Sequence, residues 1–155
     1  MPLTIGSDAP DFSLYNTEKK LVTLSDQRGE NVLLLFFPLA FTSVCTKELC
    51  EVRDSLAVYN NANVKVLGIS VDSLYTLARY KEDQELNFDL LSDFNKEVSE
   101  KYDTLYVQFG FNMKGVSKRS AFVINAMGKL VYAQVLENAS EVPDFMIIKE
   151  MLNSL

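Results

Sequence analysis

Residues 32–50 read VLLLFFPLAFTSVCTKELC, in which an apolar run ends at a proline and a more polar segment follows. The run at 32–37 is apolar throughout and has the length of a β-strand that is covered on both faces. After the proline, a helix is expected to begin near Thr42 or Ser43. Its inner stripe follows at steps of three and four residues: Leu49, Val52, Leu56 and Tyr59. A second apolar run at 64–71 completes a β-α-β unit, so the sequence predicts a buried and partly parallel sheet.

Three more helices and a hairpin are expected after this unit. Capping residues mark two helix starts: Asp72 or Ser73 before a helix with Leu74, Leu77 and Ala78 inward, and Asp93 before one with Val98 and Tyr102 inward. The segments 121–125 and 129–136 flank Ala-Met-Gly, which predicts an antiparallel hairpin with glycine in its turn. Pro143 suits the first turn of a last helix, whose inward residues are expected to be Ile147, Ile148, Met151 and Leu152. Together these elements describe an α/β sandwich.

Composition narrows the class of protein. The chain has 155 residues, 48% of them apolar and 23% charged, as expected for one soluble globular domain that spans 1–155. Its longest apolar run is far shorter than the ~20 residues of a membrane-spanning helix. With 15 Lys and Arg against 21 Asp and Glu, the net charge is -6 and no basic stripe is present, so nucleic acid is a poor candidate partner. The first residues, MPLTIGSD, lack the features of a secretory signal, which favours the cytoplasm.

Histidine is absent, and the only cysteines are Cys45 and Cys50. Without histidine, the chain lacks the usual base of serine and cysteine hydrolases and the commonest zinc ligand. Two thiols alone are a poor zinc set. We expect neither a metal nor an organic cofactor. In a reducing compartment, two cysteines five positions apart are transient redox partners or plain thiols rather than a permanent crosslink.

Cys45 falls in the first turn of the helix expected after the proline. Unpaired backbone N–H groups and the positive end of the helix dipole favour an anion there, and therefore the thiolate form of a cysteine. A thiolate is a nucleophile. The same position also extends the inner stripe of the helix, so Cys45 is equally suited to be a small buried hydrophobe. The residues alone leave both interpretations open.

Several ordered motifs resemble the peroxiredoxin family. The spacing Pro38-x-x-x-Thr42-x-x-Cys45 resembles its active-site motif. APDFSL at 9–14 is similar to the opening of the family, GISVDS at 68–73 to its second core strand, and GVSKRSAFVI at 115–124 to its arginine-bearing strand. The resemblance runs nearly end to end. It implies a thioredoxin-like α/β fold with a central mixed β-sheet and helices on both faces.

The resemblance also implies roles for individual residues. Cys45 would be the peroxidatic cysteine, with the Thr42 hydroxyl hydrogen-bonding its thiolate and the peroxide, Pro38 shielding the site and Arg119 as cationic partner. Such donors suit the reaction, because negative charge builds on the leaving oxygen while the thiolate attacks the other one. Without the resemblance, an ordinary surface cation is the better explanation of Arg119. Glu48 resembles an acidic position that hydrogen-bonds the arginine, but a solvated helix carboxylate is an equal alternative.

Cys50 is either the resolving thiol that attacks oxidised Cys45 or a buried residue. Five helical steps place it about 140° around from Cys45, on a flank where a thiol is partly exposed. A cysteine at this spacing resembles the bacterioferritin-comigratory, or Q-type, peroxiredoxins, which form an intramolecular disulfide. The apolar insert Leu39-Ala40-Phe41 is instead closer to the alkyl hydroperoxide reductase E branch. The branch stays open.

These observations predict a thiol-dependent peroxidase, an antioxidant oxidoreductase that reduces hydroperoxides and is recycled by thioredoxin or a similar dithiol protein. The alternative is a non-catalytic peroxide-sensing or binding module on the same fold. A thioredoxin-type disulfide reductase is disfavoured, because the sequence has no Cys-x-x-Cys. An aromatic stretch is expected to pack in the core or a pocket wall, or else to face a dimer partner or an organic peroxide: Tyr102, Tyr106, Phe109, Phe111 and Met113. Monomer and homodimer both remain open.

Overall fold

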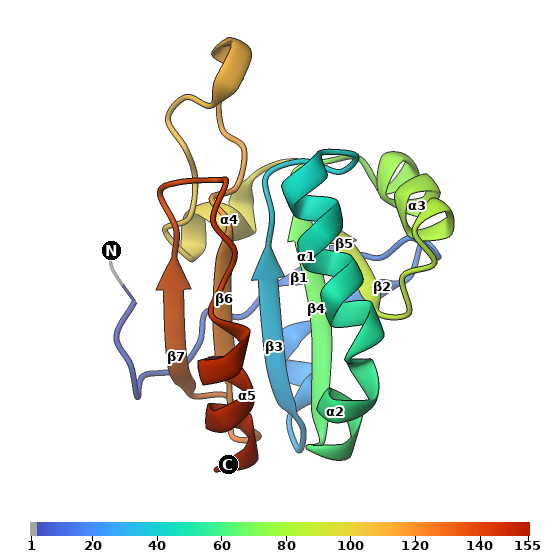
Figure 1. Ribbon diagram of the computed structural model, residues 1–155. Helices are drawn as coiled ribbons and strands as arrows, with labels where there is room; N and C mark the ends of the chain where they lie inside the picture. Colours follow the sequence, from blue (N-terminus) through green and yellow to red (C-terminus); the bar gives the residue numbers. More distant parts are fainter. Residues whose placement is uncertain (1–2) are drawn as a thin grey trace.

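The strand β3 (Asn31–Phe36) is the centre of a five-stranded sheet in the computed structural model, which describes residues 3–155 (Figure 1). Residues 1 and 2 of the predicted 1–155 domain lie outside the described residues. The strand order is β5-β4-β3-β6-β7, with β4 at Val64–Ser70, β5 at Asp89–Ser92, β6 at Ser120–Ile124 and β7 at Leu130–Val135. β3, β4 and β5 run parallel, whereas β6 and β7 are antiparallel to their neighbours. All six residues of β3 are buried, which confirms the predicted buried, mixed sheet.

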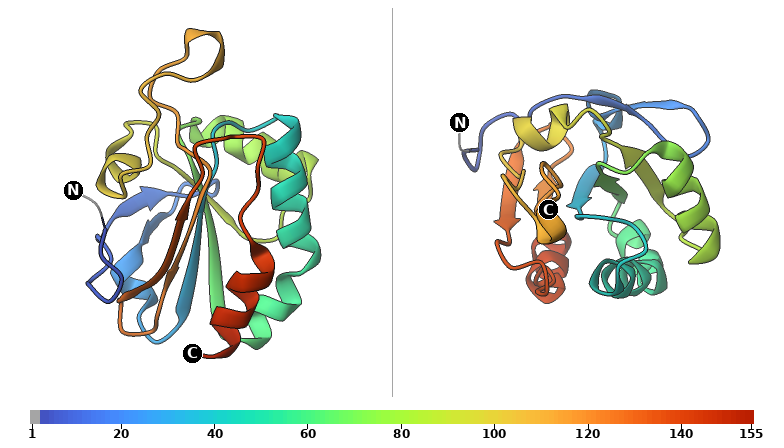
Figure 2. Two further views of the ribbon diagram at one scale, coloured as in Figure 1. Left: turned by 60° about the vertical axis from the view of Figure 1, so that its left-hand side comes forward. Right: turned by 90° about the horizontal axis from the view of Figure 1, so that it is seen from above.

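Helices cover both faces of this sheet (Figures 1 and 2). Leu33 and Leu35 point to one face, where they pack with side chains of α1 (Ser43–Asp54), α2 (Leu56–Asn61), α3 (Leu74–Asp83) and α5 (Phe145–Asn153). Leu34 and Phe36 point to the other face, toward α4 (Glu97–Lys101) and the N-terminal segment. That segment holds β1 (Ser13–Tyr15), β2 (Leu21–Thr23) and the short 3-10 helix η1 (Leu24–Gln27). Because neighbouring strand residues alternate between faces, one strand supplies both hydrophobic cores.

Local sequence signals explain most element starts. The Ser73 hydroxyl accepts a hydrogen bond from Thr76 N at 3.1 Å and caps α3, as predicted. Asp93 accepts bonds from the first turn of α4, at Val98 N and Ser99 N, although Lys96 occupies the capping position itself. The hairpin of β6 and β7 forms as expected, and Gly128 in its turn has a φ of +84°. A left-handed φ of this kind is the reason for glycine there.

The structure corrects four details. The helix that begins at Ser43 ends at Asp54, and Ser55 separates it from α2, so the expected single stripe belongs to two helices. β5 was not predicted, because four residues are too few to show a periodic pattern. The last helix is capped by Asp144, which accepts a bond from Ile147 N. Pro143 therefore precedes that helix, and Ile147 is 46% exposed.

The segment 105–117 projects beyond the end of the sheet and carries a short 3-10 helix, η2 (Gly110–Asn112) (Figures 1 and 2). Tyr102, before it, is buried in the core, as expected for the aromatic stretch. Phe111, at the tip of the projection, is 99% exposed, so the expectation of packing is wrong for this residue. Within residues 3–155, no helix has the length and apolar character needed to cross a membrane.

Candidate active site

Cys45 is completely buried in the first turn of α1. The first hydrogen bond inside this helix runs from Thr46 N to Thr42 O at 3.0 Å, so the preceding N–H groups have no acceptor in the helix itself. Thr42 occupies the capping position in an extended conformation, and among the described residues its side chain makes no capping bond. The helix start therefore keeps the positive end of its dipole available for an anion beside Cys45.

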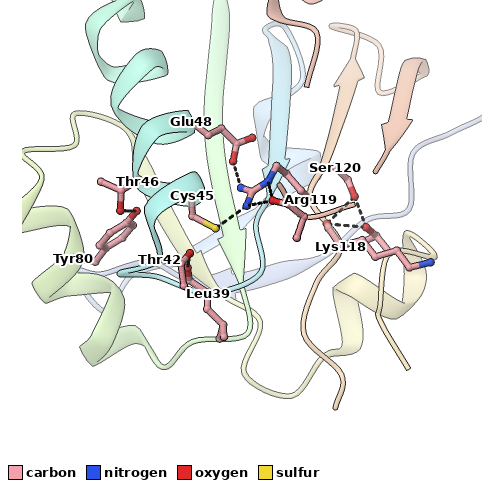
Figure 3. A network of polar contacts seen from close by, with 11 residues as sticks. Leu39, Thr42, Cys45, Thr46, Glu48, Tyr80, Lys118, Arg119 and Ser120 are labelled. Carbon is pink, nitrogen blue, oxygen red and sulfur yellow. Dashed lines mark hydrogen bonds and ion pairs between the residues drawn. The ribbon is translucent and has the colours of Figure 1, made fainter. Parts of the chain in front are cut away.

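Arg119 reaches Cys45 across the molecule (Figure 3). Its Nη2 donates to Cys45 Sγ at 3.1 Å and to the backbone oxygen of Ala139 at 3.0 Å. Its Nη1 donates to Glu48 Oε1 at 2.8 Å. Only 1% of Arg119 is exposed, so the interpretation as a surface cation is wrong. Every part of the guanidinium is directed at an acceptor, and one of these acceptors is the sulfur.

Sheet register explains how Arg119 arrives there. Ser120 pairs with Phe36 in the antiparallel β3–β6 ladder. Arg119 therefore lies level with Phe37, where the chain leaves β3 and turns toward α1. The predicted helix and the predicted arginine strand meet because both adjoin the same end of the central strand.

Glu48 is one helical turn after Cys45 and is completely buried, so the interpretation as a solvated carboxylate is wrong. Burial raises the pKa of the Glu48 carboxyl to about 7, against the opposing effect of Arg119. Burial also works against the charge of Arg119, but the negative charges of Glu48 and Cys45 outweigh it and raise the pKa of Arg119. Glu48 Oε2 has no hydrogen-bond partner within the described chain. The carboxyl therefore titrates near neutral pH, whereas the arginine stays charged.

Thr42 departs from the expected role. Its hydroxyl donates to Leu39 O at 2.8 Å and so does not make the predicted hydrogen bond to the Cys45 sulfur (Figure 3). The chain turns over residues 39–42, just before the helix, and this turn brings Leu39 O close to the hydroxyl of the capping residue Thr42. Thr42 nevertheless lines a pocket of about 220 Å³ that reaches Cys45. The other lining residues are Pro38, Ser43, Val44, Phe109, Arg119, Ala139 and Ser140.

Three further residues shape the site without having been singled out for it. Asp72 accepts a hydrogen bond from Ala40 N at 2.8 Å and so holds the loop after Pro38. The Tyr80 hydroxyl lies 2.9 Å from Thr46 Oγ1, and its ring packs edge-on against Phe41. Ala139 contributes only its backbone oxygen. Asp72 carried a cap signal, but no sequence signal identified Tyr80, and a backbone acceptor such as Ala139 leaves no trace in the sequence.

Cys50 lies in the same helix as Cys45 and is half-buried, as its helical position predicts. Both cysteines of the described chain are free thiols. Cys50 Sγ donates a weak hydrogen bond to Gln84 Oε1 at 3.6 Å, on the side of α1 that faces α3. The two sulfurs therefore have different surroundings: Cys45 faces Arg119, and Cys50 faces the end of a neighbouring helix.

The Cys45 sulfur is buried, is held by an arginine and lies at the wall of an open pocket. It is therefore equipped to attack an electrophilic oxygen. This attack is the reaction of the class of thiol-based peroxidases. Comparison with known proteins agrees. Residues 5–133 match the model of the AhpC/TSA family. Peroxiredoxin Bcp of Escherichia coli is 39% identical over 131 residues, 83% of each chain. A bcp relative from Haemophilus influenzae is 38% identical over 156 residues, 99% of each chain.

Solved structures show the same fold. A peroxidoxin BcpB from Mycobacterium tuberculosis superposes with a TM-score of 0.86 at 25% identity, over 97% of both chains. A reduced 2-Cys peroxiredoxin from Plasmodium vivax gives a TM-score of 0.85 at 29% identity, over 98% of this chain and 81% of that one. The chain belongs to the AhpC/TSA family. It is a peroxiredoxin of the Bcp type and a thiol-dependent peroxidase, which confirms the predicted family, fold and activity.

Proposed function

We propose that Cys45 is the peroxidatic cysteine and that Cys50 resolves its oxidised form. The observation that carries this proposal is the contact between Arg119 Nη2 and Cys45 Sγ at 3.1 Å. A fixed positive charge beside the sulfur stabilises the thiolate, and the same group lies next to any peroxide that enters the pocket. The substrate is a hydroperoxide.

The first step forms a sulfur–oxygen bond and breaks the oxygen–oxygen bond. The Cys45 thiolate attacks one peroxide oxygen, and the other oxygen leaves with the electron pair of the broken bond. Arg119 and the free N–H groups at the start of α1 are placed to stabilise that leaving oxygen, which then takes a proton and departs as water or an alcohol. Cys45 becomes a sulfenic acid.

In the second step, the Cys50 sulfur attacks the sulfenic sulfur, forms a disulfide and releases hydroxide, which is protonated to water. A thioredoxin-like dithiol protein then reduces the disulfide and regenerates both thiols. We also propose a cytoplasmic location, because a reducing compartment supplies such a reductant.

Intact mass after one equivalent of peroxide tests the assignments. The parent protein should lose two hydrogens, Cys50→Ser should gain one oxygen, and Cys45→Ser should keep its mass. Consumption of peroxide by Cys45→Ser at the parent rate would falsify the first assignment. Turnover is then measured with a dithiol reductant. Stoichiometric oxidation without turnover would favour the peroxide-sensing alternative.

A further inference from the structure

A second polar cluster lies beside Cys50, separate from the one around Cys45. It consists of Gln84, Arg53 and the Cys50 thiol. Gln84 caps the C-terminal end of α3. Its side-chain oxygen accepts the hydrogen bond from Cys50 Sγ, and its backbone oxygen accepts one from Arg53 Nη1 at 2.6 Å. Asn87 Nδ2 in turn donates to Arg53 O at 3.3 Å. One short segment after α3 therefore holds both the thiol and the arginine.

Arg53 lies three residues after Cys50, so the two side chains are neighbours on the surface of α1. Its side chain is 28% exposed, which makes it better shielded from water than an ordinary surface arginine. The hydrogen bond to Asp54 and a negative charge on Cys50 both raise the pKa of Arg53. Both side chains also bond to Gln84, so the guanidinium and the thiol meet at the same residue of the neighbouring segment.

We propose that Arg53 and Gln84 are positioning residues that set the reactivity of Cys50 in the resolving step. This inference rests on the proposed resolving role of Cys50. Gln84 accepts a hydrogen bond that only the neutral thiol can donate, so it holds Cys50 as a thiol while α1 is intact. The Arg53 guanidinium stabilises the thiolate that attacks the sulfenic acid once this bond is broken.

The cluster also determines which part of α1 is free to move. Arg53 is held through its side chain by Gln84 and through its backbone oxygen by Asn87. Unwinding that brings Cys50 to Cys45 is therefore confined to the helix before Arg53.

Other charged and titratable groups face the same cluster and enter its pH dependence. Asp54 pairs with Arg53 Nε at 2.9 Å, and Glu85 acts on the same guanidinium from the loop after α3. Tyr80 faces the cluster from α3, and burial raises its pKa to about 12. The two carboxylates offset part of the Arg53 charge without changing its sign, and Tyr80 stays neutral over the range in which a thiol titrates.

The test measures Cys50 without using peroxide. In a Cys45→Ser background, the rate of iodoacetamide alkylation of Cys50 is followed by intact mass from about pH 6 to 10. Arg53→Met should move the half-maximal pH upward by about half a unit, Arg53→Lys should move it less, and Gln84→Leu should move it downward. The matched control is Arg79→Met, which removes the same charge from an exposed pair with Asp83 on α3.

A second measurement uses both cysteines. After one equivalent of peroxide, the Arg53→Met protein should form the disulfide about threefold more slowly than the Arg79→Met protein at pH 7. Coincident alkylation profiles for these two variants would overturn the inference. The proposed function fails in a different way, through the absence of a disulfide in the parent protein, whatever the alkylation profile of Cys50. Circular dichroism of each variant, with Arg53→Lys as the conservative replacement, separates these effects from misfolding.

Discussion

Nη2 of Arg119 lies 3.1 Å from Sγ of Cys45, although 74 positions separate the two residues in the chain. Both are buried, so water screens little of the attraction between the guanidinium and a thiolate. The rest of the guanidinium is held by Glu48 and by the backbone oxygen of Ala139. The charge is therefore fixed in place before a peroxide arrives, which is the condition for strong electrostatic stabilisation of a leaving oxygen.

Replacing Arg119 should slow the attack on peroxide. We expect Arg119→Ala to reduce the second-order rate of Cys45 oxidation about a hundredfold, because both the thiolate and the leaving oxygen lose their charged donor. Stopped-flow measurement with hydrogen peroxide gives the rate. Lys118→Met is the matched control: it removes a positive charge one residue away that pairs with Glu137 at 2.6 Å. Equal rates in the two variants would contradict the role of Arg119.

Glu48 should make stability depend on pH in a particular direction. Its pKa is about 7 in the folded protein, against 4.5 for an unperturbed group, so the folded state holds the proton more tightly than the unfolded state. The contribution of Glu48 to stability is therefore full below about pH 4.5 and is lost as the pH rises through 7. Between pH 5 and 8, this loss amounts to about 2–3 kcal/mol.

Urea unfolding at pH 5 and pH 8 measures that loss. Glu48→Gln should reduce the difference in unfolding free energy between the two pH values, since an amide does not titrate. Glu150→Gln, which replaces an exposed carboxylate on α5, should leave the difference at its parent value. A pH dependence that survives in Glu48→Gln would mean that another group causes it.

Oxidation should loosen the first half of α1. Cys45 and Cys50 share this regular helix, which places their Cα atoms about 8.7 Å apart. A disulfide tolerates at most ~7 Å, so the helix must unwind locally to form the bond. Amide hydrogen exchange should become faster at Thr46 to Glu51 after peroxide treatment, and the Cys50→Ser protein should not show this gain. Disulfide formation with unchanged exchange would refute the model.

Tyr80 should restrain that unwinding. Its hydroxyl lies 2.9 Å from Thr46 Oγ1 and ties the first turns of α1 to α3. Tyr80→Phe keeps the ring against Phe41 but loses a bond worth about 1 kcal/mol, so disulfide formation should be roughly fivefold faster. Quenched samples resolved by intact mass give this rate. Tyr75→Phe, at an exposed position of the same helix, should behave as the parent does. A slower reaction in Tyr80→Phe than in Tyr75→Phe would count against the restraint.

The sequence by itself determined the features that depend on short stretches of chain. The apolar runs predicted the central strands, the proline and the capping residues predicted the start of α1, and that start placed Cys45 at the positive end of a helix dipole. Motif spacing singled out Arg119 as a candidate site residue. It also predicted the family, which the fold and the comparisons confirm. These features can be predicted from the sequence because strand periodicity, helix caps and turns depend on residues only a few positions apart.

Only the tertiary structure decided which side chains meet. Whether Arg119 and Glu48 were surface charges or an internal pair depended on the β3–β6 register and on their burial, which local patterns do not encode. The Thr42 hydroxyl bonds to Leu39 rather than to sulfur, Gln84 reaches Cys50 from another helix, and Phe111 lies exposed on a projecting segment. Each outcome depends on contacts between distant parts of the chain or on the path of one loop. Packing and desolvation in the folded state decide the energies of these contacts. The identity of a residue alone therefore does not determine them.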